Sequence, residues 1–382
     1  MLSTYHYCEL KEDAVKTQLK QWQQYTHSLH ILVFISESEV AEINWLQKLC
    51  ASESIRLSGA VFPCLIYEKL WKKHGILMIR LSQPVPQFLL PEIHQPDETA
   101  KAISTFVTQQ QNVICEENKP TLFMIFNALT PGISRYVDEM YLALSDQVNY
   151  AGVNAGSETF QPMDCIFTEE ICSPTGVLCL LLPEQIHFSL EHGFEPPSEV
   201  ITATATEGDR IMNIDWEPAF HAYQELVRNH FGVTLTRENF YQYGSHFPLG
   251  ILQANNHLIV RIPVGITEDQ AIQCVGDVPA NTPLVLLRGH YENCHQCAEL
   301  LTENLDENQV EKNKPLLTFY CAGRKMFLGK KSEEELAHLL KNSGASILIG
   351  ALSLGEIGSR KQWEYPLFHN TAILCAGWIP EC

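Results

Sequence analysis

Histidine is the residue type in this chain best suited to hold a metal ion, and 15 of the 382 residues are histidines. His192 stands out because it ends an apolar run and is followed at once by Gly193 and Phe194, then by a pair of prolines. A side chain at such a turn can point into a cleft rather than into a packed layer. His246 and His369 lie at similar loop-to-strand transitions next to phenylalanine. A b-type haem needs little more than one axial imidazole and an apolar pocket, so the residues alone leave the choice open.

Cysteine thiols are the next candidates for chemistry, and Cys294 and Cys297 form a CxxC pair. A structural zinc site needs a second such pair, and attachment of a c-type haem needs a histidine where Ala298 stands. A redox pair at a helix start stays open, because a helix terminus lowers a thiol pKa, and so does the alternative of two ordinary cysteines. A thiol-dependent enzyme would use Cys294 or Cys321 with a histidine within hydrogen-bond reach.

A carboxylate between two glycines is the third candidate. The apolar run at 347–354 leads into Gly355, Glu356 and Gly358, and glycine permits close backbone approach or a positive φ. Glu356 could receive a ligand cation or a hydrogen-bond donor, with Arg324 as a second polar anchor in a pocket for a small metabolite. The alternative is a turn in which Glu356 caps neighbouring backbone amides.

Phosphate and dinucleotide signatures fail on spacing. The segment 323–332 has five residues between its glycines where a phosphate loop needs four, and Lys331 separates Lys330 from Ser332. The segment 152–156 lacks the third glycine of a dinucleotide fingerprint and leads into strands. Neither an HExxH zinc motif nor a GxSxG nucleophile elbow occurs. The lack of a complete catalytic motif favours a binding or regulatory role over an enzyme.

Charge and cysteine usage narrow the class of protein. The chain has 45 acidic and 26 basic residues, a formal charge of −19, whereas nucleic acids and anionic membranes are bound through clustered basic residues. Its 13 scattered cysteines are typical of reduced, buried thiols rather than of a disulfide scaffold. The first residues do not form a signal segment, and no run is apolar for long enough to span a membrane. We therefore expect a cytoplasmic protein that binds neither nucleic acid nor membrane.

Both strands and helices are predicted to position these residues. Apolar, branched runs predict early strands at 29–35, 56–61, 76–81 and 121–126. Helical spacing predicts helices at 14–25, 37–50, 97–115, 131–148, 217–229, 291–305 and 333–342. Closely spaced strands between 149 and 214 predict a meander, and 302–314 is predicted as a polar loop. Later strands are predicted at 257–261, 270–275, 283–287, 316–321, 346–352 and 371–376.

Strands that come both in runs and in alternation with helices predict an α+β fold, with two lobes built on mixed or antiparallel β-sheets flanked by helices. No short sequence repeat stands out. The change from a strand-rich run to a helix-first unit places a boundary near residue 215. The predicted division is an N-terminal helical extension at 1–28, one lobe at 29–215 and a second at 216–382.

Several strings resemble the FIST family of bacterial sensory domains. They lie at 152–157, 200–209, 319–324, 350–357 and 368–373, and the string at 350–357 resembles the FIST C signature. Asp209 stands where asparagine is expected. The resemblance runs from about Leu29 to Ala376 and implies a FIST N-type sensory domain followed by a FIST C-type domain.

Within that family, the strings at 59–63 and 190–196 resemble the NosP subgroup, which comprises haem-bearing nitric oxide sensors that pair with histidine kinases. Phe194 stands where tryptophan is expected. The resemblance implies haem b as cofactor, nitric oxide as ligand and a histidine kinase as partner. It favours His192 as the axial ligand, with Gly193 and Phe194 beside it.

The resemblance leaves alternatives at each level. His187, His246 and His369 remain alternative iron ligands, and Arg324 and Glu356 are further candidates for cofactor binding. A homodimer is compatible with this reading. The first rival is a haem-free FIST sensor for a small molecule such as an amino acid, and the second is the thiol-dependent enzyme. In the haem reading, release of His192 from the iron would free its loop, which could then act as a two-state signalling element.

Overall fold

The computed structural model of the chain is an α+β structure, with 30% helix and 36% strand. The α+β class predicted from the sequence is therefore confirmed. The structure describes residues 4–26, 28–93, 95–110, 119–183, 186, 188–194, 199–253, 257–288, 295–307, 311–359 and 365–377. Within these ranges, no helix is both long and apolar enough to cross a membrane.

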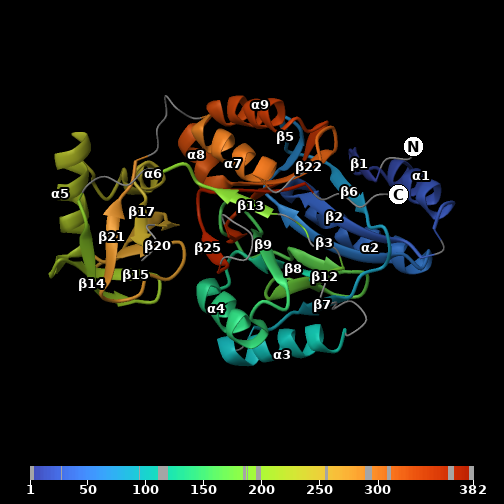
Figure 1. Cartoon of the computed structure of the whole chain (residues 1–382), viewed down its shortest axis with the longest axis horizontal. Helices are drawn as coiled ribbons and strands as arrows, with labels where there is room; N and C mark the ends of the chain where they lie inside the picture. Colours follow the sequence, from blue (N-terminus) through green and yellow to red (C-terminus); the bar gives the residue numbers. More distant parts are fainter. Residues whose placement is uncertain are drawn as a thin grey trace.

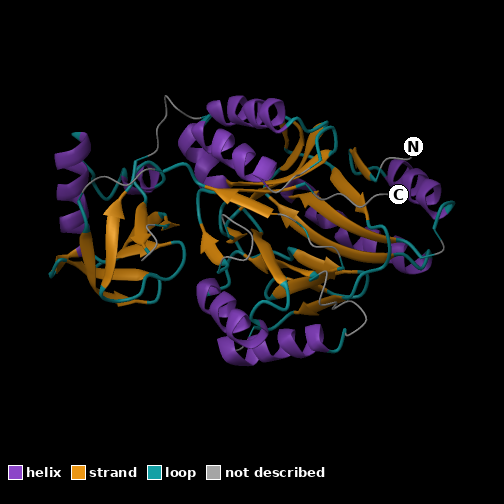
Figure 2. Ribbon diagram, in the orientation of Figure 1, coloured by secondary structure: helices purple, strands orange, loops and turns teal. Residues whose placement is uncertain are grey.

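Four sheets divide the chain into a body and an insert (Figure 1). The body comprises residues 4–194 and 295–377 and contains three six-stranded sheets, with helices on its outside. The insert, residues 199–288, contains the eight-stranded sheet and lies beside the body (Figure 2). The sheets are not partitioned at residue 215, because strands from both halves of the chain pair within the body.

The body consists of three repeats of one element order: strand, helix, strand, helix and four further strands. The first repeat contains β1 (Tyr5–Cys8), α1 (Glu12–Gln23), β2 (His30–Ser36), the 3-10 helix η1 (Glu37–Glu42), α2 (Ile43–Ser52), β3 (Arg56–Phe62), β4 (Leu65–Glu68), β5 (Leu70–Lys72) and β6 (Ile76–Arg80). The second contains β7 (Gln87–Leu90), α3 (Pro96–Thr108), β8 (Thr121–Asn127), α4 (Ile133–Leu144), β9 (Asn149–Ala155), β10 (Ile166–Thr168), β11 (Cys172–Ser173) and β12 (Val177–Leu182).

The third repeat has the same order but carries the insert between its first strand and its first helix. It contains β13 (Phe188–Glu191), α7 (Gln296–Glu307), β22 (Pro315–Cys321), α8 (Ala322–Leu328), α9 (Lys331–Ser343), β23 (Ile347–Ser353), β24 (Glu356–Gly358), β25 (Leu367–His369) and β26 (Ile373–Ala376). The parallel strands of the three repeats, β2 and β3, β8 and β9, and β22 and β23, are almost wholly apolar and buried, as parallel strands usually are.

Each repeat gives one strand pair to the sheet of another repeat. The strands β4 and β5 extend the sheet of the third repeat beside β23, β10 and β11 extend that of the first beside β3, and β24 and β25 extend that of the second beside β9. The exchange is cyclic and closes after three steps. The body is therefore a single cooperative unit rather than three separable domains.

A glycine marks the fourth position of the seven-residue third strand in every repeat: Gly59 in β3, Gly152 in β9 and Gly350 in β23. A Cβ on Gly350 would lie 1.9 Å from the carbonyl oxygen of Thr318, and one on Gly152 would lie 2.5 Å from that of Met124. The neighbouring backbone thus requires glycine at these two positions. This shared position supports the internal repeat at the level of sequence.

Aromatic side chains join the three sheets at the centre of the body. Phe319 of β22 lies 5.4 Å from Phe34 of β2, 6.0 Å from Phe62 of β3 and 5.9 Å from Phe123 of β8, measured between ring centroids. All four rings are buried. Aromatic pairs at such distances add to the free energy gained by burial, so the sheets share one core.

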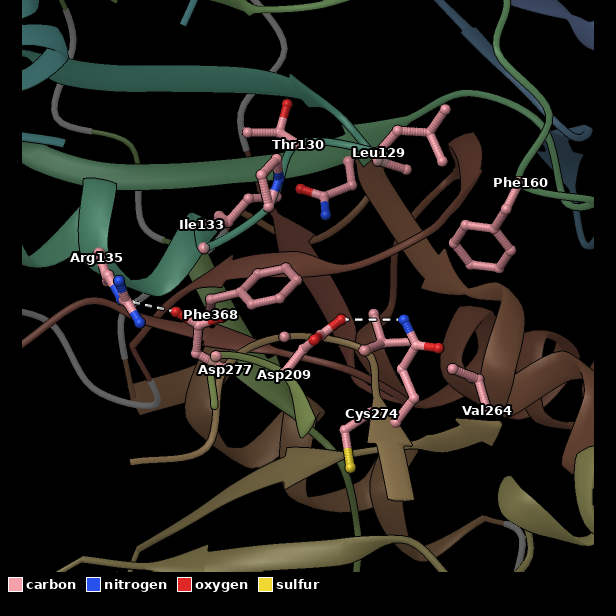
Figure 3. A pocket seen from close by; sticks show the side chains of 18 of the residues that line it. Leu129, Thr130, Ile133, Arg135, Phe160, Asp209, Val264, Cys274, Asp277 and Phe368 are labelled. Atoms are coloured by element: carbon pink, nitrogen blue, oxygen red, sulfur yellow. Dashed lines mark hydrogen bonds and ion pairs between the residues drawn. The ribbon is translucent and has the colours of Figure 1, made fainter. Parts of the chain in front are cut away.

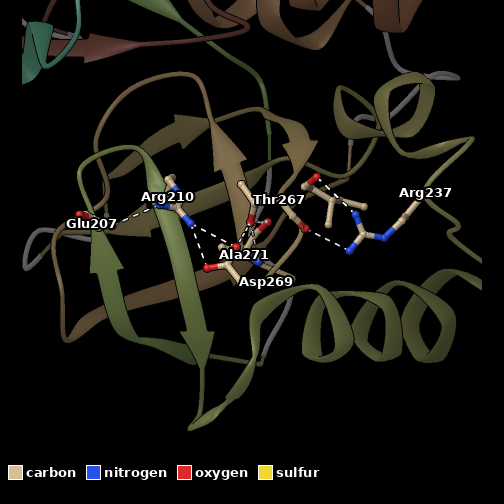
Figure 4. A network of polar contacts seen from close by, with 7 residues as sticks. Glu207, Arg210, Arg237, Thr267, Asp269 and Ala271 are labelled. Carbon is tan, nitrogen blue, oxygen red and sulfur yellow. Dashed lines mark hydrogen bonds and ion pairs between the residues drawn. The ribbon is translucent and has the colours of Figure 1, made fainter.

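The insert has a core of its own. It contains β14 (Ile201–Glu207), β15 (Arg210–Ile214), β16 (Glu217–Pro218), α5 (Ala219–Phe231), α6 (Phe240–Gly244), β17 (Leu249–Leu252), β18 (Leu258–Arg261), β19 (Pro263–Ile266), β20 (Ile272–Cys274) and β21 (Thr282–Leu286). Polar contacts tie its edge together (Figure 4). Arg210 pairs with Asp269 at 3.0 Å, and Arg237 donates to the carbonyl of Thr267 at 3.0 Å.

Two sequence predictions differ from this fold. Although β14 and β15 do pair as antiparallel neighbours, the predicted meander is wrong between 149 and 191, because β9, β10, β12 and β13 lie in three different sheets. Short connections join these strands, but they carry the chain from one sheet to the next instead of closing hairpins. The predicted polar loop at 302–314 is partly helix, since α7 continues to Glu307.

Candidate functional site

Pairing of β13 with β26 brings two of the predicted iron ligands together. His192 follows β13, and His369 is the last residue of β25. Their ring centroids lie 6.2 Å apart with an interplanar angle of 34°, and the Phe194 ring lies 5.9 Å from His192. Both imidazoles are buried, with 4% and 3% of each residue exposed. We call His192 and His369 the histidine pair.

Backbone contacts fix the ring of His192. The N–H of Phe194 donates to its Nδ1 at 3.0 Å, so in the neutral ring the proton is on Nε2. Gly193 between them has a φ of +66°, and a Cβ there would lie 2.8 Å from Cβ of Cys297. Glycine is therefore required at this turn for two reasons, its backbone angle and its close neighbour.

Arg324 lies beside the histidine pair, but its donors are used inside the protein. Its Nη1 donates to the carbonyl of His192 at 2.8 Å. Its Nε and Nη2 donate to both carboxylate oxygens of Glu335 on α9, at 2.8 and 2.6 Å, in a bidentate ion pair that is buried. Tyr320 donates to the same carboxylate at 2.6 Å. Arg324 thus links the segment after β13 to helices α8 and α9.

Glu356, the first residue of β24, is fully buried. Ser353 Oγ donates to it at 2.6 Å, and the N–H of Ala372 donates at 3.3 Å. Burial raises the pKa of its carboxyl to about 8, against the smaller opposing effect of these hydrogen bonds. The first and second repeats have Leu65 and Ile166 at the equivalent place, paired with the fifth residue of the adjacent strand. Glu356 is a polar replacement in an apolar position.

A cleft of about 880 Å³ lies between the insert and the second repeat (Figure 3). Its body side is formed by the ends of β8 and β9 and the first turn of α4. Its insert side is formed by the β14–β15 turn and the segment that follows β20. The residues that line it include Asn154, Phe160, Arg135, Phe368, Val264, Asp209 and Asp277. The described residues that line it include no histidine and neither Arg324 nor Glu356.

Contacts across the cleft fasten the insert to the body. Nε of Arg135 on α4 lies 2.8 Å from a carboxylate oxygen of Asp277 in the insert. Arg261 of the insert is buried and donates to the carbonyl of Phe368 and to Oγ of Ser134, both at 2.9 Å. Phe368 precedes His369, so the insert touches the same strand that carries one member of the histidine pair.

Comparison with protein families then gives two matches. The FIST N domain matches residues 30–217, and the FIST C domain matches residues 219–359. The chain belongs to the FIST family. FIST domains are sensory domains in signalling proteins. No curated protein matches the chain.

The remaining predicted ligands of this FIST protein are not part of the histidine pair. His246 is half-buried after α6, where its ring lies 5.2 Å from Phe327 of α8, and burial lowers its pKa. His187 and Cys294 lie outside the described residues. Within the described ranges, no group of three or more His, Cys, Asp or Glu side chains is placed to hold a metal ion.

Two of the candidate thiols of the FIST protein, Cys297 and Cys321, lie among the described residues and are buried. Burial raises the pKa of Cys297 and of Cys321 well above the usual thiol value. The Cys297 thiol donates to the carbonyl of Glu191 at 3.3 Å. Because the thiolate is the nucleophile, neither side chain has the environment of a reactive cysteine.

Sequence reasoning missed the residues of the cleft. Asn154 lies in the string 152–157, which was noted for its glycines and for its resemblance to the FIST N half. Arg135 lies in the first turn of a helix that was predicted correctly. A signal was present in the order of elements, since the carboxyl ends of parallel strands followed by a helix N-terminus often form ligand sites in α/β units.

Proposed function

We propose that this FIST protein is a cytoplasmic, haem-based nitric oxide sensor that regulates a partner histidine kinase. The observation that carries the proposal is the 6.2 Å spacing of the histidine pair. Two buried imidazoles this close could both reach one metal ion, so His192 and His369 are the residues that would hold the iron of a haem. The NosP resemblance of the string that contains His192 and the sensory role of FIST domains support the same function.

The donor set of the histidine pair fits iron, but its packing is closed. His192 would have to give up the hydrogen bond from the Phe194 N–H to ligate through Nε2, since Nδ1 would then carry the proton. Both rings are buried, so haem loading has to displace neighbouring side chains. When bound, the haem would supply reversible binding of nitric oxide.

A chain of side-chain contacts connects the histidine pair to the surface of the protein. Arg324 binds the His192 carbonyl, so a change in the segment after β13 would act on Arg324. Arg324 also binds Glu335, so the change would reach helix α9. Helix α9 lies on the outside of the body (Figure 1), where a partner protein could contact it. The net charge of −19 is compatible with output to a protein rather than to nucleic acid.

Haem titration of single-histidine variants tests the proposal. We expect the wild-type chain to bind one haem with a Soret band that shifts on addition of nitric oxide, and His192→Ala to lose this binding. His369→Ala should change the band position, because it removes the second imidazole. His246→Ala is the matched control and should leave the spectrum unchanged. Unchanged spectra in both His192→Ala and His369→Ala would reject the histidine pair as the iron site.

The kinase step has a separate test. We expect the haem-loaded protein to change the autophosphorylation rate of a histidine kinase encoded next to it, and nitric oxide to reverse or enhance that change. The His192→Ala variant should have no nitric oxide response. An equal response with this variant would show that the signal does not depend on His192.

A haem-free small-molecule sensor is the second candidate, and the cleft is the observation that favours it. Its originally expected anchors, Arg324 and Glu356, contact protein groups and do not line the cleft. A haem-free sensor would therefore have to use other residues. A protein that stays colourless after incubation with haem would favour this candidate over the first.

A further inference from the structure

We propose that the cleft between the insert and α4 is a ligand site separate from the histidine pair. The ligand class is a small organic anion that has an aromatic or other apolar body and one N–H or O–H donor. The cleft volume of about 880 Å³ admits a molecule of this size with room for water.

Asn154 supplies the first argument. It is 1% exposed and lines the cleft, and its Oδ1 has no hydrogen-bond partner among the described residues. The sixth position of the same strand is Val61 in the first repeat and Leu352 in the third, and both are fully buried. The fold therefore accepts an apolar residue at this place. A buried acceptor without a donor costs free energy, and a ligand N–H or O–H would remove that cost.

The first turn of α4 forms the part of the cleft that would bind the anionic group of the ligand. Gly132 precedes the helix with a φ of +68°, and no side chain caps the helix at this end. The free N–H groups of a first turn attract negative charge, and Arg135 adds a guanidinium. Asp277 of the insert already places a carboxylate 2.8 Å from Arg135. Arg135 is 62% exposed at its side chain, so it can bind a second carboxylate as well as Asp277.

Apolar and aromatic side chains form the walls between these two ends. Phe160 and Phe368 come from the body, and Val264 comes from the insert (Figure 3). Phe368 is 3% exposed and packs against the place of Gly355, where a Cβ would lie 2.5 Å from its ring. Phe368 thus gives the cleft an aromatic wall on which a ring of the ligand could pack.

Hippurate is a suitable probe because it has a phenyl ring, one amide N–H and one carboxylate. Methyl hippurate lacks the charge, and N-methylhippurate lacks the donor. We expect ligand-observed NMR with the full chain to show saturable binding of hippurate, about tenfold tighter than that of either analogue. Absence of saturable hippurate binding, or equal affinity for all three probes, would overturn the proposal.

Two variants assign the preferences to residues. Arg135→Gln, at an exposed side chain, should abolish the preference for hippurate over methyl hippurate. Asn154→Leu, which copies the third repeat, should abolish the preference over N-methylhippurate. Arg237→Gln in the insert, which is outside the cleft (Figure 4), and Asn149→Leu on the same strand as Asn154 are the controls and should retain both preferences. Retention of both preferences in Arg135→Gln and Asn154→Leu would overturn the site.

The haem proposal and the proposal of a ligand site in the cleft can be tested independently of each other. His192→Ala should bind hippurate as the wild type does, because the described lining of the cleft includes no histidine. Loss of hippurate binding in His192→Ala would show that the cleft is not a separate site. A normal Soret band in Arg135→Gln would show in turn that haem binding does not depend on the cleft.

Discussion

At the scale of single residues, the buried places at which the chain departs from its own repeat include Glu356 and Asn154. Glu356 replaces the apolar Leu65 and Ile166, and Asn154 replaces the apolar Val61 and Leu352. Each substitution puts a polar group where the other repeats bury hydrocarbon, at a cost in stability. Both lie in the sheet that joins the second repeat to β24 and β25, which is also the sheet that faces the cleft and carries His369.

The pH dependence of stability tests the state of Glu356. Its carboxyl has a pKa of about 8 in the folded protein, and 4.5 is the value of a free side chain. Between these values the unfolded chain loses this proton while the folded protein keeps it, so stability falls as pH rises. We expect the free energy of unfolding of Glu356→Gln, relative to that of the wild type, to rise by up to about 1.4 kcal/mol per pH unit between pH 5 and 8, measured by urea unfolding. Parallel curves for the two proteins would contradict a neutral Glu356.

Sequence reasoning favoured one member of the histidine pair in advance, named the other as an alternative, and did not name the cleft. His192 was identified from its place at the end of an apolar run and from the resemblance of its string. Its closeness to His369 depends on the pairing of β13 with β26, which are separated by the whole insert, and no local pattern contains that pairing. Asn154 becomes conspicuous only when the three repeats are aligned, because one asparagine in a strand is otherwise unremarkable.

At the scale of elements, individual helices and strands were predictable but their partners were not. Long apolar runs such as 121–126 and amphipathic runs such as 97–108 carry their own periodicity. Sheet membership is different, because the chain leaves each sheet after its third strand and enters the sheet of another repeat. The shared glycine of β3, β9 and β23 was the available signal for the repeat, and it is too sparse to stand out in one sequence.

Alanine substitutions at glycine positions test how tightly the third strands are held. Gly350→Ala would place a Cβ 1.9 Å from the backbone oxygen of Thr318, so we expect a loss of about 3 kcal/mol or more. Gly59→Ala should cost less, since its neighbour is the ring of Phe167, a side chain that can shift. Gly232→Ala has open space around it and should cost only about 1–2 kcal/mol of backbone strain. Urea midpoints that do not follow this order would contradict the close approach of β22 and β23.

At the scale of the whole molecule, the insert is a unit with its own sheet and core, docked against the body. The body is closed by cyclic strand exchange, whereas the insert has its own core and is joined to the third repeat between β13 and α7. Its contacts with the body include those of Arg261, the Arg135–Asp277 ion pair, a small apolar cluster around Phe194 and the packing of His246 on Phe327.

Arg261 is therefore the residue whose loss should free the insert. Its two hydrogen bonds to the body, to Phe368 and Ser134, are together worth about 3 kcal/mol, roughly a hundredfold in the undocked population. We expect Arg261→Ala to increase the radius of gyration in small-angle X-ray scattering and to speed amide exchange at β25 and the start of α4. Arg210→Ala removes a guanidinium whose ion pairs lie within the insert (Figure 4), so it should change neither. Equal exchange at β25 in both variants would mean that apolar contacts alone hold the insert against the body.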